Sequence, residues 1–218
     1  FIIPLYTQSI LGWTAEDAGL LFIPSVIATA FMMPIIGKLL ERGVKQQYLV
    51  AGGLCIFFRY SLWAYKILTP DTSADSFWWL LMFRGFGLSM LFIPITTLAL
   101  STLHGQEIGQ GAAFTGMMRQ LGGSFGVAII TTFLASKNMV HRVDLISHLS
   151  ATDPAVQNRV SMMQHSFMSK GITPDKALQS AYQSLDFSVM KQSMVLSYMD
   201  VFLFIGVIFL ICVPFVLL

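Results

Sequence analysis

The stretch AGLLFIPSVIATAFMMPIIG, residues Ala18–Gly37, contains 20 consecutive residues without a charge. A helix of about 20 mostly apolar residues is long enough to cross the hydrocarbon core of a bilayer. Three further stretches reach this length with at most two charged residues each, and 18 uncharged residues end the chain. Phe1 to about Leu11 adds a partial span, so we expect one truncated and five complete transmembrane helices. The complete spans are predicted near residues 18–37, 47–68, 77–101, 109–135 and 201–218, the last extending back to about 197.

The composition of the whole chain has the same bias. Charged residues make up 11% of the 218 residues and hydrophobic residues 55%, whereas a soluble domain carries about 25% charged residues. A net charge of +2 provides no basic surface for nucleic acid. Cys55 and Cys212 lie inside apolar runs and give neither a disulfide framework nor a metal site. The composition therefore predicts an all-α polytopic membrane protein rather than a soluble enzyme.

The distribution of cations predicts the orientation of the spans, because short loops rich in Lys and Arg stay in the cytoplasm. Residues 38–46 contain Lys38, Arg42 and Lys45, whereas residues 70–76 contain no cation. We therefore place 38–46 in the cytoplasm and 70–76 outside. Alternation then puts the 102–108 turn and the C-terminus in the cytoplasm.

Residues 137–196 differ in composition from the membrane part, residues 1–136 and 197–218. They hold ten of the 24 charged residues and three of the four histidines, which we interpret as solvated side chains. Gly171 breaks the segment, and Thr173-Pro174 is typical of a helix start. One apolar stripe recurs every four residues beyond it, at Ala177, Ala181, Leu185 and Val189. We predict an extracytoplasmic loop with an amphipathic helix, packed on the membrane part or on a partner; a mobile loop is the alternative.

Three arginines lie inside predicted spans, where a charge is costly and is by default functional or paired. Arg59 lies within Phe57–Tyr60, where aromatic faces could hold its guanidinium. Arg84 is a candidate for the cavity or for a charge network, with snorkelling as the alternative. Arg119 is a candidate for gating between helices.

Carboxylates are absent from the depth of the complete spans. Asp200, at the outer end of the last span, is a further candidate for the charge network, with helix capping as the alternative. The chain has no sequence motif of a hydrolase, a metal site or a phosphate-binding loop. We therefore expect neither a catalytic residue nor a metal or cofactor.

Glycines cluster in residues 105–126. The spacing Gly122-x-x-x-Gly126, with Gly123 between them, allows another backbone to approach closely. This pattern predicts tight helix packing.

Several motifs together resemble the 14-span drug:proton antiporters of the major facilitator superfamily, the EmrB/QacA type. The stretch GAAFTGMMRQLGGSFG, Gly111–Gly126, is similar to the penultimate helix of that family. YTQSILG at Tyr6–Gly12 and PIIGKLLER at Pro34–Arg42 resemble the start of its last six spans and a loop motif of its second half. The pattern Gln192-x5-Tyr198-x-Asp200, after a long outer loop, resembles the entry to its last helix.

The resemblance implies the C-terminal part of a multi-pass exporter in the bacterial cytoplasmic (inner) membrane. Such a protein moves hydrophobic or amphipathic drugs against proton influx by alternating access. A long outer loop also suits a periplasmic adaptor protein and an outer-membrane channel as partners. The proton-coupling residues are then expected in the half outside this chain. The gating and packing residues are expected at Arg119, Gln120, Gly122, Gly123 and Gly126.

Two alternatives stay open. A major-facilitator transporter could carry another substrate, such as a siderophore, a sugar or a lipid. A membrane subunit without transport activity could instead present residues 137–196 to a partner.

Overall fold

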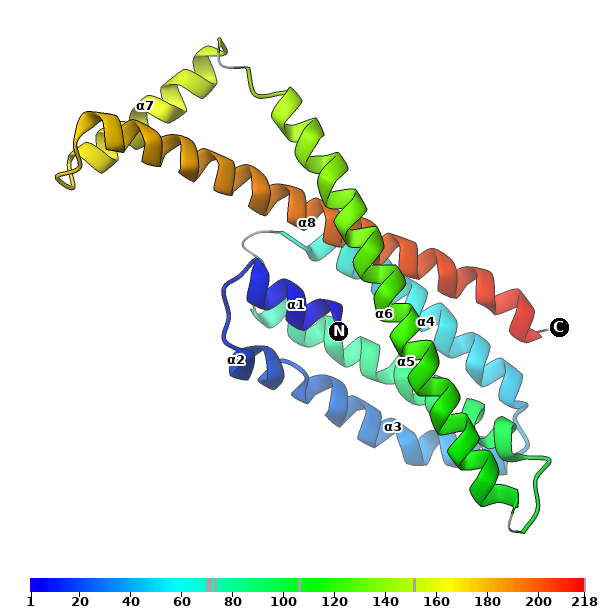
Figure 1. Cartoon of the computed structure of the whole chain (residues 1–218). Helices are drawn as coiled ribbons and strands as arrows, with labels where there is room; N and C mark the ends of the chain where they lie inside the picture. Colours follow the sequence, from blue (N-terminus) through cyan, green and yellow to red (C-terminus); the bar gives the residue numbers. More distant parts are fainter. Residues whose placement is uncertain (70–71, 73, 106, 151, 218) are drawn as a thin grey trace. The chain divides into compact units, whose positions relative to one another are not determined.

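The computed structural model describes residues 1–69, 72, 74–105, 107–150 and 152–217, and in this part all regular structure is α-helical (Figure 1). This confirms the predicted all-α fold. Six residues lie outside the described part of the chain: Pro70, Asp71, Ser73, Gln106, Ala151 and Leu218. They belong to the predicted turns at 70–76 and 102–108, to the 137–196 segment and to the end of the last predicted span. The helices are α1 (Ile2–Ser9), α2 (Ala15–Leu20), α3 (Ile23–Glu41), α4 (Gln46–Ile67), α5 (Ala74–Leu100), α6 (Glu107–Ser147), α7 (Pro154–Met168) and α8 (Pro174–Leu217).

The chain forms two compact units, each described here by itself. The first consists of Phe1–Phe133 and Tyr198–Leu218, and the second of Leu134–Ser197. The second unit overlaps the segment 137–196 that composition sets apart. Its location outside the membrane remains a prediction.

Three helical segments of the described chain are long and apolar enough to cross a membrane: Ala15–Glu41, Asp75–Leu100 and Pro174–Leu217. The helices α4 and α6 coincide in position with the other two predicted spans and have sufficient length. Their lower hydropathy follows from Arg59 and Lys66 in α4 and from the glycine-rich first half of α6.

The centre of the first unit is α5, which packs against both α3 and α4. Its side chains Phe77, Leu80 and Leu81 are completely buried. At Gly85 the backbones of α3 and α5 approach so closely that an added Cβ would clash with the carbonyl oxygen of Ser25. The Thr29 hydroxyl shares its proton between the Ser25 carbonyl of its own helix, at 2.7 Å, and the Gly85 carbonyl across this contact, at 3.1 Å.

The predicted span 18–37 divides into α2 and α3. Thr14 caps α2 by accepting a hydrogen bond from the backbone N–H of Asp17, as expected of an N-terminal Thr. A turn at Leu21 and Phe22 follows, because Pro24 lacks an N–H and favours the first turn of a new helix. Gly43, with φ of 83°, ends the helical path after α3.

Two helices extend beyond their predicted spans. Helix α6 continues from the predicted end near residue 135 to Ser147, because no Gly or Pro interrupts this stretch. Helix α8 begins at Pro174, where the sequence predicts a helix start, and continues without a break into the last predicted span.

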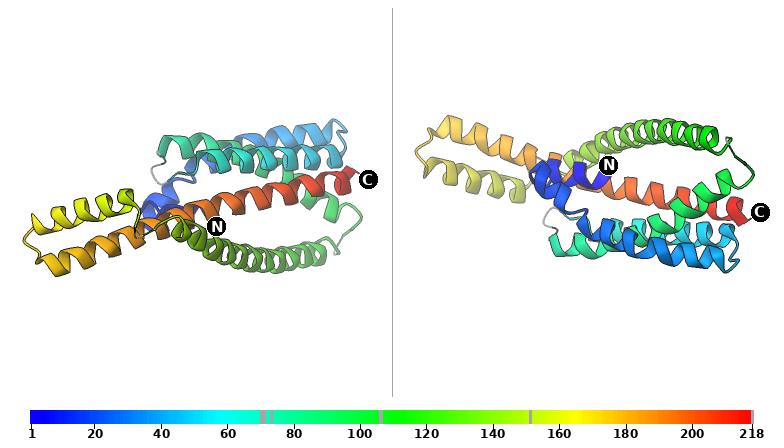
Figure 2. Two further views of the ribbon diagram at one scale, coloured as in Figure 1. Left: turned by 90° about the horizontal axis from the view of Figure 1, so that it is seen from above. Right: turned by 90° about the horizontal axis from the view of Figure 1, so that it is seen from below.

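The second unit contains α7 and the adjoining parts of α6 and α8. Figure 2 shows α7 beside the first turns of α8, where Ala177 and Ala181 are completely buried. The Gln164 side chain donates a hydrogen bond to the Pro174 carbonyl at 3.2 Å. An Arg142–Asp186 ion pair of 2.8 Å joins the end of α6 to α8.

Candidate substrate cavity

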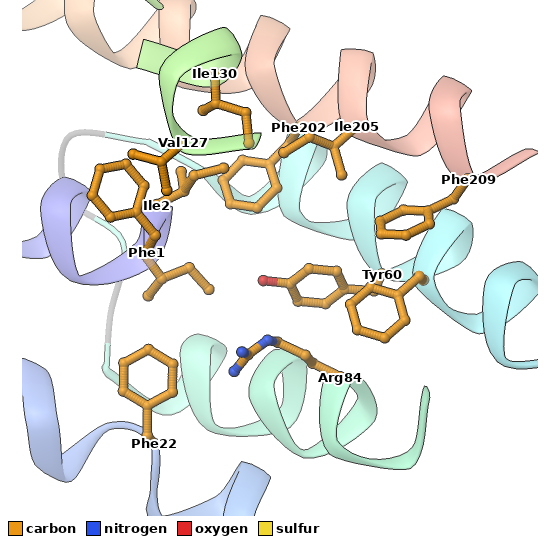
Figure 3. Close-up of a pocket in the computed structure, with 12 residues that line it drawn as sticks. Phe1, Ile2, Phe22, Tyr60, Arg84, Val127, Ile130, Phe202, Ile205 and Phe209 are labelled. Carbon is orange, nitrogen blue, oxygen red and sulfur yellow. The ribbon is translucent and has the colours of Figure 1, made fainter. Parts of the chain in front are cut away.

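A cavity of about 270 Å³ lies within the first unit (Figure 3). Residues from the start of the chain, the turn between α2 and α3, α4, α5, α6 and α8 surround it, so that it is formed by segments far apart in the sequence. Most of its lining is aliphatic or aromatic. The lining residues are Phe1, Ile2, Ile3, Phe22, Phe57, Tyr60, Arg84, Val127, Ile130, Phe202, Ile205 and Phe209.

Two polar side chains reach this apolar cavity, Arg84 from α5 and Tyr60 from α4. In Figure 3 the guanidinium and the phenol both point toward the middle of the cavity. The Arg84 Cζ atom lies 5.3 Å from the centroid of the Phe22 ring, within the range of a cation–π contact. Tyr60 is only 6% exposed, yet its hydroxyl has no hydrogen-bond partner among the described residues.

Helical periodicity explains how the aromatic wall forms. Phe57 and Tyr60 are three residues apart on α4, and Phe202, Ile205 and Phe209 are three and four apart on α8, so each set shares a helix face. The Phe57 and Phe209 rings are 5.0 Å apart, and Tyr60 meets Phe202 edge-on at 6.1 Å.

Small residues make room for this wall. An added Cβ at Gly87 of α5 would lie 2.9 Å from the Phe57 ring, and one at Gly206 of α8 would lie 3.0 Å from the Ser61 Cβ atom. The absence of these side chains lets α5 and α8 approach α4. These glycines, with Gly85, were not identified from sequence because they do not belong to the glycine cluster of α6.

A hydrogen-bonded aromatic cluster lies near the ends of α1 and α4. The Tyr6 hydroxyl donates to the Thr69 carbonyl at 2.6 Å. The Tyr6 ring meets Tyr198 edge-on at 5.3 Å, and the Ser9 and Tyr198 hydroxyls are 3.2 Å apart. These contacts fix α1, which provides part of the cavity wall, to α8.

The structure brings only one of the three candidate charge-network residues to the cavity. Arg84 lines it, whereas Arg59 is exposed on another face of α4 and lines a shallow groove with Trp63 and Lys66. No aromatic ring among the described residues holds the Arg59 guanidinium, in contrast to the expectation from sequence. Asp200 is half-buried on α8, has an interaction of its own, and is not among the cavity residues.

The candidate gating and packing residues lie on the exposed surface of α6. The Arg119 guanidinium lies 4.6 Å from the centroid of the Phe92 ring and 3.5 Å from the Thr96 hydroxyl, both on α5, and Gln120 is exposed. No described side chain or neighbouring backbone comes within 4 Å of a Cβ built at Gly122, Gly123 or Gly126. The packing predicted at these glycines is therefore absent from the contacts of the described chain, and their role remains a prediction.

Tyr60 is the cavity residue whose role sequence reasoning missed. The Phe57–Tyr60 stretch was interpreted as an aromatic environment for Arg59. The three-residue spacing of Phe57 and Tyr60, continued by the buried Ala64, instead indicates an inward face that excludes Arg59.

The cavity combines an apolar wall with one cation and one phenol. Its described lining contains no carboxylate, histidine or cysteine, so it offers no general acid–base pair and no thiol nucleophile. One cation and one phenol in an apolar wall can instead orient a ligand that has an apolar body and a polar end.

Comparison with known proteins shows the family. Residues 1–127, more than half of the chain, match the family model described as Major Facilitator Superfamily. The chain belongs to the major facilitator superfamily of membrane transporters.

Individual relatives are similar over most of this chain. It is 30% identical to the uncharacterized MFS-type transporter YhcA of Bacillus subtilis over 87% of its length, and 23% identical to the fatty acid resistance protein FarB of Neisseria gonorrhoeae over 99%. It is 25% identical to the multidrug export protein EmrB of Escherichia coli over 75% of its length. The matches cover 37%, 40% and 32% of these three relatives, respectively.

Proposed function

We propose that the full-length protein carrying this chain exports hydrophobic and amphipathic compounds across the cytoplasmic membrane of a bacterium, in exchange for protons and by alternating access. The observation that carries this proposal is the apolar cavity with two polar groups inside the first unit. The relatives of this chain include proteins named for multidrug export and for fatty acid resistance. A facilitator of a siderophore, a sugar or another lipid is the alternative.

The proposal includes an orientation. Residues 38–46 and the C-terminus face the cytoplasm, and residues 137–196 face outward. The Lys and Arg content of the short loops supports this arrangement. A cysteine introduced at exposed Lys45, in the inner loop, is expected to resist an impermeant maleimide in whole cells. A cysteine at exposed Val143 in the second unit is expected to react.

The proton carrier is proposed to lie outside this chain. Proton-driven transport requires a titratable group accessible from both sides of the membrane. The described cavity lining contains no such carboxylate or histidine. We therefore expect Asp200→Asn to leave proton coupling intact in the full-length protein.

Filling the cavity tests the proposed function. We expect Ile205→Trp, which places a large ring in the cavity, to lower dye efflux by the full-length protein at least about tenfold in a pump-deficient host, because overfilling a packed site is disruptive. The matched control is Leu203→Trp, two residues along α8 and exposed, which should keep efflux near the wild-type rate. Wild-type protein that changes neither drug tolerance nor dye accumulation would refute multidrug export.

A periplasmic adaptor and an outer-membrane channel are proposed partners of the second unit. Its exposed apolar side chains include Met139, Val143 and Phe187. A photo-crosslinker at Val143 should capture one specific adaptor, whereas the same group at Tyr48 should not. A specific product from a protein without transport activity would favour the alternative of a membrane subunit that only presents this unit.

A further inference from the structure

We infer that the cavity selects amphiphiles with one acidic group. The acid binds the Arg84 guanidinium and the Tyr60 hydroxyl, and the apolar tail lies against the aromatic wall. The inference rests on the proposed function, because it names the substrate class of the same cavity. The inference adds the sign of the ligand's charge, which the hydrophobicity of the cavity wall does not determine.

The first observation behind this inference is the positive charge of the cavity lining. Arg84 is the charged side chain of the described lining, and a guanidinium stays protonated in proteins. Within the described residues it has no ion-pair partner, and its recorded contact is the face of Phe22 at 5.3 Å. An unpaired charge in apolar surroundings is unfavourable, so an anionic ligand gains from neutralising it and a cationic ligand is repelled.

Tyr60 provides an independent second observation. It is more than nine-tenths buried, its hydroxyl points into the cavity, and no described residue accepts or donates a hydrogen bond there. The ring is buried while the hydroxyl oxygen stays open to the cavity, so a ligand in the cavity can supply the partner. A carboxylate between the two groups would accept the phenol O–H with one oxygen and guanidinium N–H groups with the other, and charge-assisted hydrogen bonds of this kind are the stronger ones.

The rest of the lining fits a short apolar tail. Phe57, Phe202 and Phe209 provide aromatic surface, and Val127 and Ile130 provide aliphatic surface from α6. The volume of about 270 Å³ is just below the range of roughly 300–1,000 Å³ common for small-molecule sites. Medium-chain fatty acids and compact aromatic acids are therefore the expected ligands.

The test compares three probes that share one tail: octanoate, methyl octanoate and octyltrimethylammonium. Binding of each to the purified full-length protein in lipid nanodiscs is measured by calorimetry, with empty nanodiscs as the background. We expect octanoate to bind at least about tenfold more tightly than the ester, as for a hydrogen-bonded charged group, and the cation to bind most weakly. Equal binding of octanoate and the ester, or tighter binding of the cation, would overturn the inference.

Variants assign this preference to the two side chains. Arg84→Gln should weaken octanoate binding about tenfold or more and leave the ester within about twofold. Tyr60→Phe should weaken octanoate binding by about three- to tenfold, and Arg84→Lys should restore part of the loss. Arg59→Gln is the matched control, an arginine of α4 outside the cavity, and an equal effect there would contradict the assignment.

The same measurements separate this inference from the proposed function. Dye efflux that persists together with equal binding of acid and ester would overturn the acid preference alone. If the purified protein prefers the acid but exports nothing from cells, the inference about acid binding stands and the proposed export function is refuted.

Discussion

The two glycines of α5, Gly85 and Gly87, and three glycines in the middle of α6, Gly122, Gly123 and Gly126, have opposite surroundings. At Gly85 an added Cβ would meet the backbone and a side chain of α3, and at Gly87 it would meet Ile56 and Phe57 of α4. At Gly122, Gly123 and Gly126 it would meet no described atom within 4 Å apart from the adjoining residues and backbone of α6 itself. Glycine therefore allows close helix packing only at positions that face another helix. The spacing of glycines in the sequence does not show which positions those are.

The largest effect is expected for Gly85→Leu in the full-length protein. The new side chain would collide with the Ser25 carbonyl and the Ala28 Cβ atom, and backbone atoms cannot move aside as a flexible side chain can. Overfilling a packed contact costs about 1–3 kcal/mol and sometimes more. We expect loss of most folded protein, measured as the monodisperse yield after detergent extraction. Normal yield and thermal stability would show that α3 and α5 are not this close.

A smaller effect on folding is expected for Gly122→Leu, together with a clear loss of transport. The predicted role of this glycine is to accept another backbone during alternating access, and no described contact holds it in the folded chain. We expect yield near that of the wild type and efflux lowered about tenfold in a dye assay. Ser124→Leu, two residues away and exposed, serves as the control. Unchanged efflux in both variants would identify the glycine face as a surface without a packing role.

Removing the hydrogen bond at the tight contact should have a still smaller effect. Thr29→Val keeps the shape and deletes a hydroxyl that bonds to the Ser25 carbonyl of its own helix at 2.7 Å and reaches the Gly85 carbonyl of α5 at 3.1 Å. Interhelical hydrogen bonds in membranes contribute about 0.6 kcal/mol on average, so we expect a decrease of this size in the free energy of unfolding. Thr97→Val is the control, because its hydroxyl bonds within its own helix. An equal decrease in both variants would mean that the interhelical bond adds nothing.

The smallest effect is expected for Arg119→Gln at the exposed α5–α6 contact. The guanidinium faces Phe92 at 4.6 Å, and exposed cation–π contacts contribute about 0.5–1 kcal/mol. We expect a decrease at the lower end of this range, with an equal decrease for Phe92→Leu and none further in the double variant. If transport falls far more than stability does, Arg119 acts in gating as the sequence resemblance predicts.

The fold class could be predicted because the thickness of the bilayer sets a minimum length for an apolar helix that crosses it. The uninterrupted run in α3 and the single charge in the predicted 77–101 span were sufficient to indicate helices there. Helix ends were harder to predict. Helix α6 continues to Ser147 because polarity does not end a helix, whereas the break between α2 and α3 depends on Pro24 within an otherwise uniform apolar run.

The site could be predicted only in part. A charged residue inside a span indicates that its burial is energetically costly, but it does not indicate which neighbour its side chain faces. Arg59 and Arg84 look alike in sequence, and their faces differ once the periodicity of the helices is applied. Tyr60 carries no charge and stands out only when its burial and its missing hydrogen-bond partner are known. The cavity combines six segments of the chain, and no local pattern predicts that assembly.

The interior prolines Pro34, Pro94 and Pro214 have a shared consequence for bending. Each lies in the C-terminal half of its helix, in α3, α5 and α8 respectively, and each leaves the carbonyl four residues earlier without its usual donor. In the proposed orientation these three helices cross the membrane in the same direction, from outside to inside. Their weakened turns then lie in the cytoplasmic leaflet, so that the inner ends can splay while the outer ends keep their tilt.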